Sequence, residues 1–329
     1  MVKSKNNAVV VGEIVETNFK FDPDATNLFD SSIKGAYVRD DFKNPSFLRV
    51  KVERHDDAND PTKVTSTANV RVNMYNVFKE FNKKDGSRGV NSTFNELEKI
   101  KNAPNGGIGL AVKIKGTYGE SKYATDDGQI KRSNVFTGQY IELSNVDLSG
   151  SKADAELTGV IGGIRDEVVA ENETGRKLVD FYTVRAVKDG VPKVDYMNLV
   201  VDKSLADAFE SEFDMGDSAT LSVEIKDVQH GSVKKESKGF GSRSAETTSG
   251  YLASEFQIFN GSVLDDSDAG YIDEDEFQTI LKAHDLENQS LIQKKMAKGG
   301  KVNTVDGVFT AEEKDTLPFG NTEEVNPFA

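Results

Sequence analysis

The sequence predicts a mainly β protein made of two similar five-stranded barrels in tandem, followed by a helix and a polar tail. Three observations support this class: an internal duplication, strands with alternating apolar residues, and one helical segment at the same place in each repeat. At 329 residues the chain is long enough for two or three domains, each with a core of its own.

The duplication is visible in short strand-like segments that recur in the same order. Segments 7–14 and 154–161 open the two repeats with a glycine at the same place, and segments 47–52 and 181–186 match next. Their period-two alternation is typical of half-buried strands. Further strands are expected at 70–75 and 194–200, at 110–115 and 221–226, and at 138–146 and 254–263.

A helix is expected between the third and fourth strands of each repeat. Thr93 to Glu96 form a capping-box pattern, and Leu205, Phe209 and Phe213 recur at intervals of four residues. The resulting order, β-β-β-α-β-β, is the topology of an OB-fold. The alternative is a pair of unspecialised small β domains. The predicted domains are 1–147, an OB-like barrel; 148–264, a second OB-like barrel; 265–300, a helical segment; and 301–329, a disordered acidic tail.

The composition excludes several classes of site. The chain has no cysteine and three histidines, so it has neither disulfides nor thiolate chemistry. Phosphate-binding, nucleophile-elbow and metalloprotease motifs are missing from the sequence, and we expect a protein that is not an enzyme and needs no cofactor. Without an apolar run of about 18 residues or a signal-peptide core, a cytoplasmic protein with no membrane partner is expected.

The net charge of −14 is unevenly distributed. Residues 262–329 hold 15 acidic against 6 basic side chains, a charge of −9, which leaves −5 for residues 1–261. An acidic chain is unusual for a nucleic-acid binder, but here the end of the chain carries most of the excess. The barrels are therefore close to neutral.

Strand alternation in both repeats predicts a surface that mixes aromatic and cationic side chains, as single-strand binding requires. In the first repeat Leu48, Val50 and Val52 are expected inside. The outward candidates are Phe47, Arg49, Lys51, Arg71 and Tyr75, with Phe181, Arg185 and Tyr196 in the second repeat. The alternative is that Phe47 and Phe181 are core residues and that the cations are merely solvated.

The loop between the last two strands is basic and contains aromatic residues in both repeats. This loop is one of two that clamp a ligand in OB-folds, although an ordinary solvated loop remains the alternative. The candidates are Lys122, Tyr123, Lys131 and Arg132 in the first repeat and Lys234, Lys235, Lys238, Phe240 and Arg243 in the second, with Arg165, Arg176 and Lys177 extending the cationic track.

One acidic segment has a different possible role. Asp265, Ser267, Asp273 and Glu276 occupy ligand positions of an EF-hand calcium loop, and Gly270 stands at its sixth position. A strand instead of a helix precedes this loop, and an alanine replaces one ligand. We therefore favour a negatively charged first turn of the following helix, expected at 274–298.

The chain ends in two acidic clusters that are each followed by Pro-Phe. Such an end resembles the C-terminal tip of bacterial and phage single-stranded DNA-binding proteins, which recruits replication and repair partners. The resemblance covers the last fifteen residues and the barrel order. The tail residues it concerns are Asp315, Pro318, Phe319, Glu323, Glu324, Pro327 and Phe328.

Two departures from that family matter. Its familiar bacterial members have one barrel per chain, assemble as oligomers and end on the phenylalanine, whereas Ala329 ends this chain. Two barrels look more like enlarged phage-type binders, which implies a phage-encoded monomer or weak oligomer in the host cytoplasm. The alternative for the tail is a solubilising end in which the Pro-Phe pairs occur by chance.

The expected function is coating and protecting single-stranded DNA during replication, recombination or repair, with recruitment of replication or recombination proteins through the tail. The alternative is a two-domain protein-binding or structural module of a virion or an assembly, with or without a calcium loop.

Overall fold

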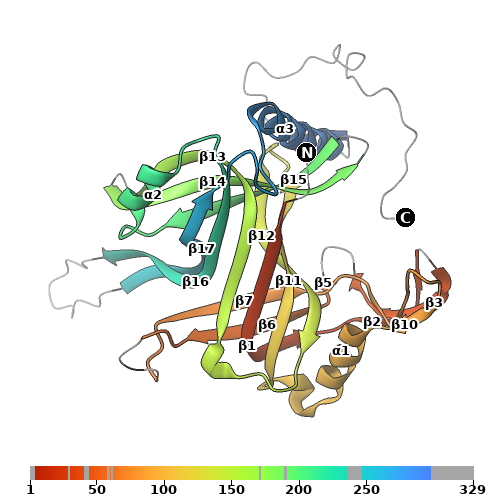
Figure 1. Cartoon of the computed structure of the whole chain (residues 1–329). Helices are drawn as coiled ribbons and strands as arrows, with labels where there is room; N and C mark the ends of the chain where they lie inside the picture. Colours follow the sequence, from red (N-terminus) through yellow and green to blue (C-terminus); the bar gives the residue numbers. More distant parts are fainter. Residues whose placement is uncertain are drawn as a thin grey trace. The chain divides into compact units, whose positions relative to one another are not determined.

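The fold consists of two closed five-stranded barrels joined into one ten-stranded sheet (Figure 1). This is a computed structural model, and it describes residues 4–28, 30–40, 44–57, 60, 62–169, 172–188, 191–235 and 247–297. The chain has two compact units: a first unit, residues 1–121 with 132–286, which holds most of both barrels, and a second unit, residues 122–131 with 287–329.

Barrel 1 closes because its first strand pairs with its second and its fourth, and its third strand pairs with its fifth. The strand order is β1-β6-β7-β12-β11, and β11 returns to β1. The pairings of β1 with β11, of β1 with β6 and of β6 with β7 are antiparallel, while β12 pairs with β7 in parallel. The strands are β1 (Asn6–Asn18), β6 (Phe47–Arg54), β7 (Ser66–Asn73), β11 (Ala111–Ala124) and β12 (Ile130–Glu142).

Barrel 2 repeats the same plan, in the order β13-β14-β15-β17-β16, and β16 returns to β13. β1 also pairs antiparallel with β13, which makes the sheet continuous between the barrels. Its strands are β13 (Lys152–Val169), β14 (Asn172–Lys188), β15 (Val191–Val201), β16 (Ser218–Lys235) and β17 (Thr247–Val263).

A helix lies between the third and fourth strand of each barrel: α1 (Ser92–Asn102) and α2 (Ala206–Glu212). The predicted OB topology is therefore confirmed. The N-cap of α1 is Asn91, whose side chain accepts from the backbone N–H of Thr93, so the helix starts slightly before the capping box expected at Thr93. A short turn, η1 (Pro104–Gly107), follows α1, and η2 (Leu148–Gly150) links the barrels.

Barrel 1 carries small additional sheets that the sequence did not predict. A three-stranded sheet and two strand pairs are inserted around β6 and β7. They are β2 (Phe21–Asn27), β3 (Asp30–Tyr37) and β8 (Val77–Phe78), then β4 (Arg39–Asp40) with β5 (Asn44–Pro45), and β9 (Glu80–Asn82) with β10 (Arg88–Val90). Tyr37 packs on Phe94 of α1, with ring centroids 5.1 Å apart, and connects the insertion to the barrel core.

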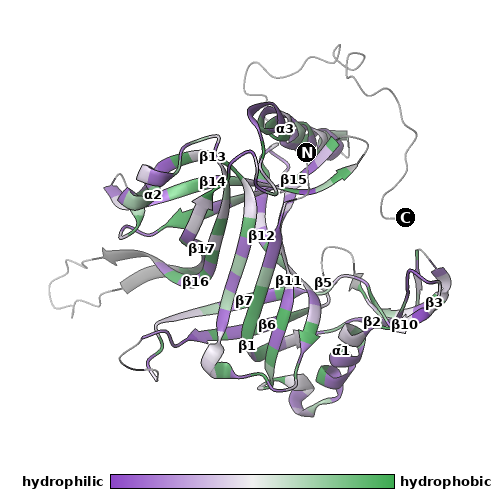
Figure 2. Cartoon of the chain, in the orientation of Figure 1, coloured by the Kyte–Doolittle hydropathy of each residue, from purple (hydrophilic) through white to green (hydrophobic). Residues whose placement is uncertain are grey.

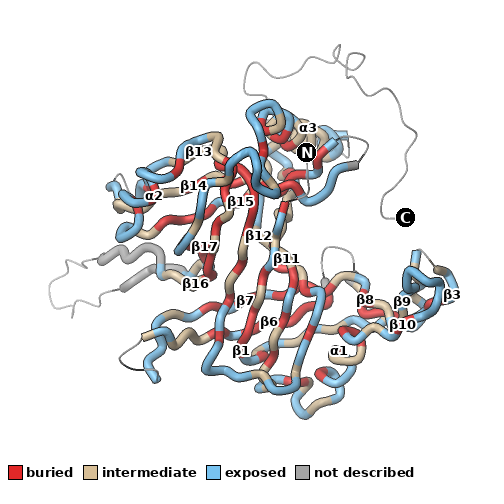
Figure 3. Tube along the Cα trace, in the orientation of Figure 1, coloured by how far each residue is buried: buried red, intermediate tan, exposed pale blue. Residues whose placement is uncertain are grey.

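Alternating apolar and polar residues along the strands build the core (Figure 2), and the buried positions follow the barrel strands (Figure 3). The apolar cluster is continuous between the barrels, since Tyr118 of β11 contacts Phe256 of β17 edge to face at 4.8 Å. Arg54 of β6 adds an ion-paired contact, lying 3.2 Å from Glu224 of β16 and also bonding Asp154 of β13.

The C-terminal helix α3 (Glu274–Ala297) has the predicted extent. Its first part belongs to the first unit, where Phe277 and Ile280 are buried against barrel 2. In the second unit its later part pairs with the tip of the β11–β12 hairpin, with Lys122 to Glu287 at 2.9 Å and Lys295 to Asp126 at 2.8 Å. Among the residues described, no helix is apolar over a membrane-spanning length.

Candidate nucleic-acid interface

The outer face of β1, β6 and β7 brings together three of the predicted cations. Directly opposite residues of antiparallel strands lie on the same face of a sheet. Arg49 is opposite Arg71, and Lys51 is opposite Asn69. The inward residues of β6, Leu48, Val50 and Val52, are at most 2% exposed, as the alternation predicts. We call the outward positions on these three strands the barrel-1 face.

The arginine pair is the unusual feature of the barrel-1 face. Like charges directly opposite each other on a sheet are destabilising unless other groups compensate them. Arg49 donates from Nε to Glu16 of β1 at 2.7 Å and remains 38% exposed. Arg71 donates to the amide oxygen of Asn73 at 3.3 Å, and its guanidinium lies 4.0 Å above the ring centroid of Phe47. The two arginines offer an approaching anion two guanidinium groups on neighbouring strands.

Phe47 is not the exposed stacking platform that the sequence suggested. Its side chain is 7% exposed beneath Arg71, so the ring is a support for the guanidinium. One flat side of the Arg71 guanidinium packs on the Phe47 ring, and a nucleobase can stack on the opposite side. The aromatic contribution to this face is therefore indirect.

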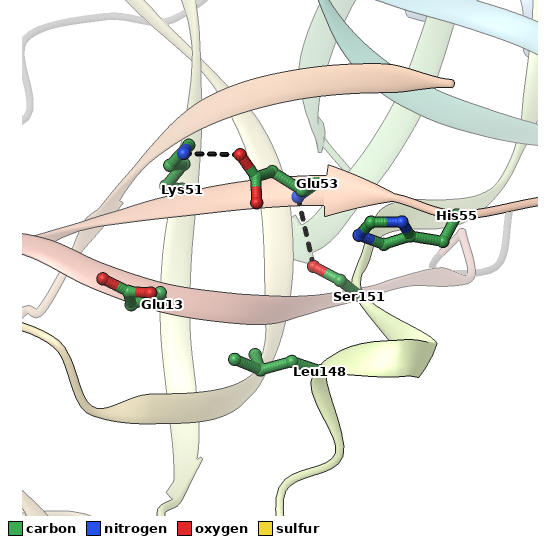
Figure 4. Close-up of a pocket in the computed structure, with 6 residues that line it drawn as sticks. All are labelled: Glu13, Lys51, Glu53, His55, Leu148 and Ser151. Atoms are coloured by element: carbon green, nitrogen blue, oxygen red, sulfur yellow. Dashed lines mark hydrogen bonds and ion pairs between the residues drawn. The ribbon is translucent and has the colours of Figure 1, made fainter. Parts of the chain in front are cut away.

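Lys51 lies at the rim of a small pocket (Figure 4). Its Nζ is 2.5 Å from a carboxylate oxygen of Glu53, and that hydrogen bond and charge raise the pKa of Lys51, so it stays a cation. The pocket is also lined by Glu13, His55, Leu148 and Ser151. Its volume of about 50 Å³ is large enough to hold water.

The hairpin of β16 and β17 begins beside the barrel-1 face. Asn69 of β7 donates to Asp227 of β16 at 2.7 Å, and Ser254 of β17 donates to the other carboxylate oxygen at 2.6 Å. Lys234 and Lys235 end β16, but their side chains are outside the described residues, as are Lys238, Phe240 and Arg243. The loop candidates of the second repeat stay predictions.

The predicted outer face of barrel 2 is wrong for β14. Phe181 is 0% exposed and Thr183 1%, so both point into the barrel, while Tyr182 and Val184 point outward. The reason is register: matching 47–52 to 181–186 misaligned the repeats by three positions, and an odd shift moves every side chain to the other face.

Two glycines give the correct alignment of the repeats. A Cβ at Gly12 would lie 2.2 Å from the carbonyl oxygen of Lys51, and a Cβ at Gly159 would lie 2.1 Å from that of Tyr182. These matching close approaches make Tyr182 the counterpart of Lys51. Phe181 then corresponds to the inward-pointing Val50.

The outward positions of barrel 2 are covered by α3. Val160, Val184 and Val194 form one apolar cluster with Phe277 and Ile280 of the helix. Tyr196 is also not an open platform. It stacks on His284 of α3 with ring centroids 6.0 Å apart, and its hydroxyl donates to Asp180 at 2.5 Å. Burial and that hydrogen bond raise the pKa of Tyr196 to about 12.

Other predicted cations pair with carboxylates in the described structure. Arg176 and Lys177 are only 16% and 14% exposed. The pairs are Arg132 with Glu120 at 2.8 Å, Arg165 with Asp180, Arg176 with Glu167 at 3.3 Å and with Glu255, Lys177 with Asp166 at 2.7 Å and Glu210 at 2.6 Å, and Arg185 with Asp195 at 3.7 Å. Arg176 and Lys177 are therefore held in internal ion pairs and do not form an open cationic track.

The remaining loop candidates of barrel 1 belong to the second unit. Tyr123 is 62% exposed, Lys131 is exposed, and Lys122 is nearly buried beside Glu287. Tyr75, which follows β7, is partly exposed. Tyr123 and Lys131 keep the accessibility that a loop contact requires.

The candidate calcium loop caps a helix. Asp265 accepts from the backbone N–H of Ser267 at 3.0 Å, and Asp273 accepts from that of Glu276 at 2.8 Å. In the described part of the chain, no three acidic or histidine side chains are grouped to hold a metal. The residues from 298 onward, including Asp315, Pro318, Phe319, Glu323, Glu324, Pro327 and Phe328, lie outside the described residues.

Sequence reasoning missed the opposition of Arg49 to Arg71 and the docking of α3. A signal for the second was present, because Phe277, Ile280 and His284 recur at helical spacing on one face of the segment. The opposition of Arg49 to Arg71 depends on the register between β6 and β7, which alternation within a single strand does not give.

Comparisons with known proteins find distantly similar solved structures and a matching family. The wild-type single-stranded DNA binding protein from Thermus aquaticus aligns with 9% identity and a TM-score of 0.45, over 82% of this chain and 97% of that one. A deletion mutant of that protein aligns with 9% identity and a TM-score of 0.44, over 82% and 98%. No curated protein sequence matches the chain. The YorF family model matches residues 47–298, more than three quarters of the sequence, and the chain therefore belongs to the YorF family.

Proposed function

We propose that this protein binds single-stranded DNA through the barrel-1 face and acts as a binding protein, not as an enzyme. The observation that carries the proposal is the placement of Arg49 opposite Arg71 on the outside of a closed OB-type barrel. The outward face of the second and third strands is where OB-folds bind oligonucleotides. Lys51 extends the same face by one residue pair.

The chemistry of the barrel-1 face suits a phosphodiester strand. Guanidinium groups bind phosphate through paired hydrogen bonds, and Arg71 is already oriented by the ring of Phe47. The side of its guanidinium that faces away from Phe47 offers a plane on which a base can stack without regard to sequence. Binding should therefore depend strongly on salt and weakly on base identity.

The biological setting is a finer part of the same proposal. Coating and protection of single-stranded DNA in replication, recombination or repair would use the barrel-1 face together with the basic loop at 234–243. Recruitment of replication or recombination proteins would use the acidic Pro-Phe clusters at 312–319 and 323–328, which can pair with basic surfaces. A phage-encoded protein acting as a monomer or weak oligomer in the host cytoplasm fits this role.

A titration with labelled oligo-dT at two salt concentrations tests the function. We expect wild-type binding that weakens with salt, and a salt slope that falls by about 0.7 in Arg71→Met, one lost single-strand phosphate contact. Methionine keeps an apolar chain over Phe47. The matched control is Arg88→Met, because Arg88 is 48% exposed on β10 and pairs with Glu80 at 3.2 Å.

Two results would count against the proposal. If the wild-type protein does not bind oligo-dT at low salt, the DNA-binding function is wrong, and a protein-binding or structural module becomes the better explanation. If Arg71→Met and Arg88→Met change the salt slope equally, the barrel-1 face is not the binding site.

A further inference from the structure

We propose that the chain holds single-stranded DNA on the outward strand face of barrel 1 only, and that α3 occupies the corresponding strand face of barrel 2. This inference rests on the proposed function. It assigns the two barrels different tasks: barrel 1 binds the strand, and barrel 2 anchors the C-terminal helix.

The two faces can be compared position by position, using the glycine alignment. In barrel 1, Glu13 of β1 lies opposite Lys51 of β6, which lies opposite Asn69 of β7. The corresponding row in barrel 2 is Val160, Tyr182 and Tyr196, listed in the same order across β13, β14 and β15. A charged and polar row has an apolar and aromatic counterpart.

The arginine pair also has no cationic equivalent in barrel 2. Two residues before Tyr182 on β14 is Asp180, and it is opposite Asn198 on β15. These are the counterparts of Arg49 and Arg71 in the same alignment. A carboxylate at this place repels phosphate, and Arg165 bonds to it. This position is therefore a paired carboxylate in barrel 2, whereas in barrel 1 it is a cation that stays 38% exposed beside Glu16.

The contact with α3 is a packed interface. Val160, Val184 and Ile280 are each 0% exposed, and Val194 and Phe277 are no more than 4% exposed. Near the rim of this cluster, His284 is 4% exposed, packs edge to face on Tyr182 at 5.4 Å and lies 3.3 Å from Glu120. Figure 1 shows α3 beside β15. A face with this composition is built to hold an amphipathic helix.

A pair of double variants tests the inference, because each pair removes two positive charges from exposed arginines. Arg49→Gln with Arg71→Gln changes the barrel-1 face, and Arg165→Gln with Arg185→Gln changes barrel 2, where the side chains are 47% and 52% exposed. We expect the first variant to lose at least tenfold in oligo-dT affinity at low salt and about 1.4 in salt slope. The second should stay within twofold of wild type, with circular dichroism confirming that both are folded.

Loosening α3 is the second arm of the test. Ile280→Ala weakens the helix contact and should leave oligo-dT affinity within twofold of wild type. A tenfold gain would show that α3 hides a nucleic-acid site, and would overturn the inference. If Ile280→Ala does not fold, the comparison of the two glutamine variants still tests which barrel binds the strand.

The failures of the function and of the inference are distinguishable. No wild-type binding at low salt overturns the proposed function. Wild-type binding with equal losses in both glutamine variants overturns the inference and leaves the function intact. Retained binding in the barrel-1 variant overturns the assignment of the strand to barrel 1.

Discussion

Replacing Ile280 by alanine should destabilise the protein by about 3 kcal/mol. Ile280 is 0% exposed in the cluster that joins α3 to barrel 2. The substitution removes three carbon atoms, worth about 0.8 kcal/mol each, and it leaves a cavity whose cost adds to that loss. Observed costs of Ile→Ala in buried sites are about 2–5 kcal/mol, which brackets the expected value.

Urea unfolding at equilibrium measures the loss, and hydrogen exchange of the α3 amides shows where it falls. The matched control is Thr279→Ala, one residue earlier on an exposed position of the same helix, for which we expect a change within about 0.7 kcal/mol. A loss below 1 kcal/mol for Ile280→Ala, with unchanged exchange in α3, would show that the helix is not docked as described.

Three further predictions concern the barrel geometry, the titration of buried tyrosines and the tail. Gly159→Ala should lower the thermal midpoint strongly, because its Cβ would lie 2.1 Å from the carbonyl oxygen of Tyr182. The control is Gly150→Ala, whose Cβ would enter open space and should leave the midpoint unchanged. Equal midpoints in the two variants would contradict the close approach at Gly159. Burial raises the pKa of Tyr37 to about 12, so its stabilising effect is complete below pH 10 and is lost as the pH rises through 12. Unfolding free energies measured from pH 9 to 12 should therefore fall less steeply in Tyr37→Phe than in wild type, and identical slopes would contradict this. Removing residues 302–329 should tighten oligo-dT binding if the acidic tail competes for the barrel-1 face, whereas equal affinity would leave the tail only a partner-binding role.

The order of elements could be predicted from the sequence because each barrel strand carries its own signal. Alternation identifies a strand from neighbouring residues alone, and the glycines at 12 and 159 mark the same place in the first strand of each repeat. The C-terminal helix could also be predicted, from the helix-forming residues of segment 274–298. What local signals do not give is the pairing between strands.

The errors at the candidate site follow from that limit. The side of the sheet on which Phe181 lies depends on how the two repeats are aligned. The similarity of the segments that begin at Phe47 and Phe181 suggested an incorrect alignment. The ion pairs were not predictable either, because the partners are far apart in sequence: Arg176 bonds to Glu255, 79 residues later. A count of cations along the chain therefore overestimated the open cationic surface.

The structure distinguishes the two barrels. The sequence left the two barrels open, because barrel 2 has the more basic loop and barrel 1 the more regular aromatic and cationic strand face; the exposure and pairing of the described side chains favour barrel 1. Arg71 contacts an amide and an aromatic ring, whereas Arg49, Arg165, Arg176 and Arg185 contact carboxylates. A phosphate that reaches Arg71 competes with a neutral group, whereas at the other four arginines it must compete with an internal anion. Among these arginines, Arg71 is therefore the one at which a phosphate meets the least internal competition.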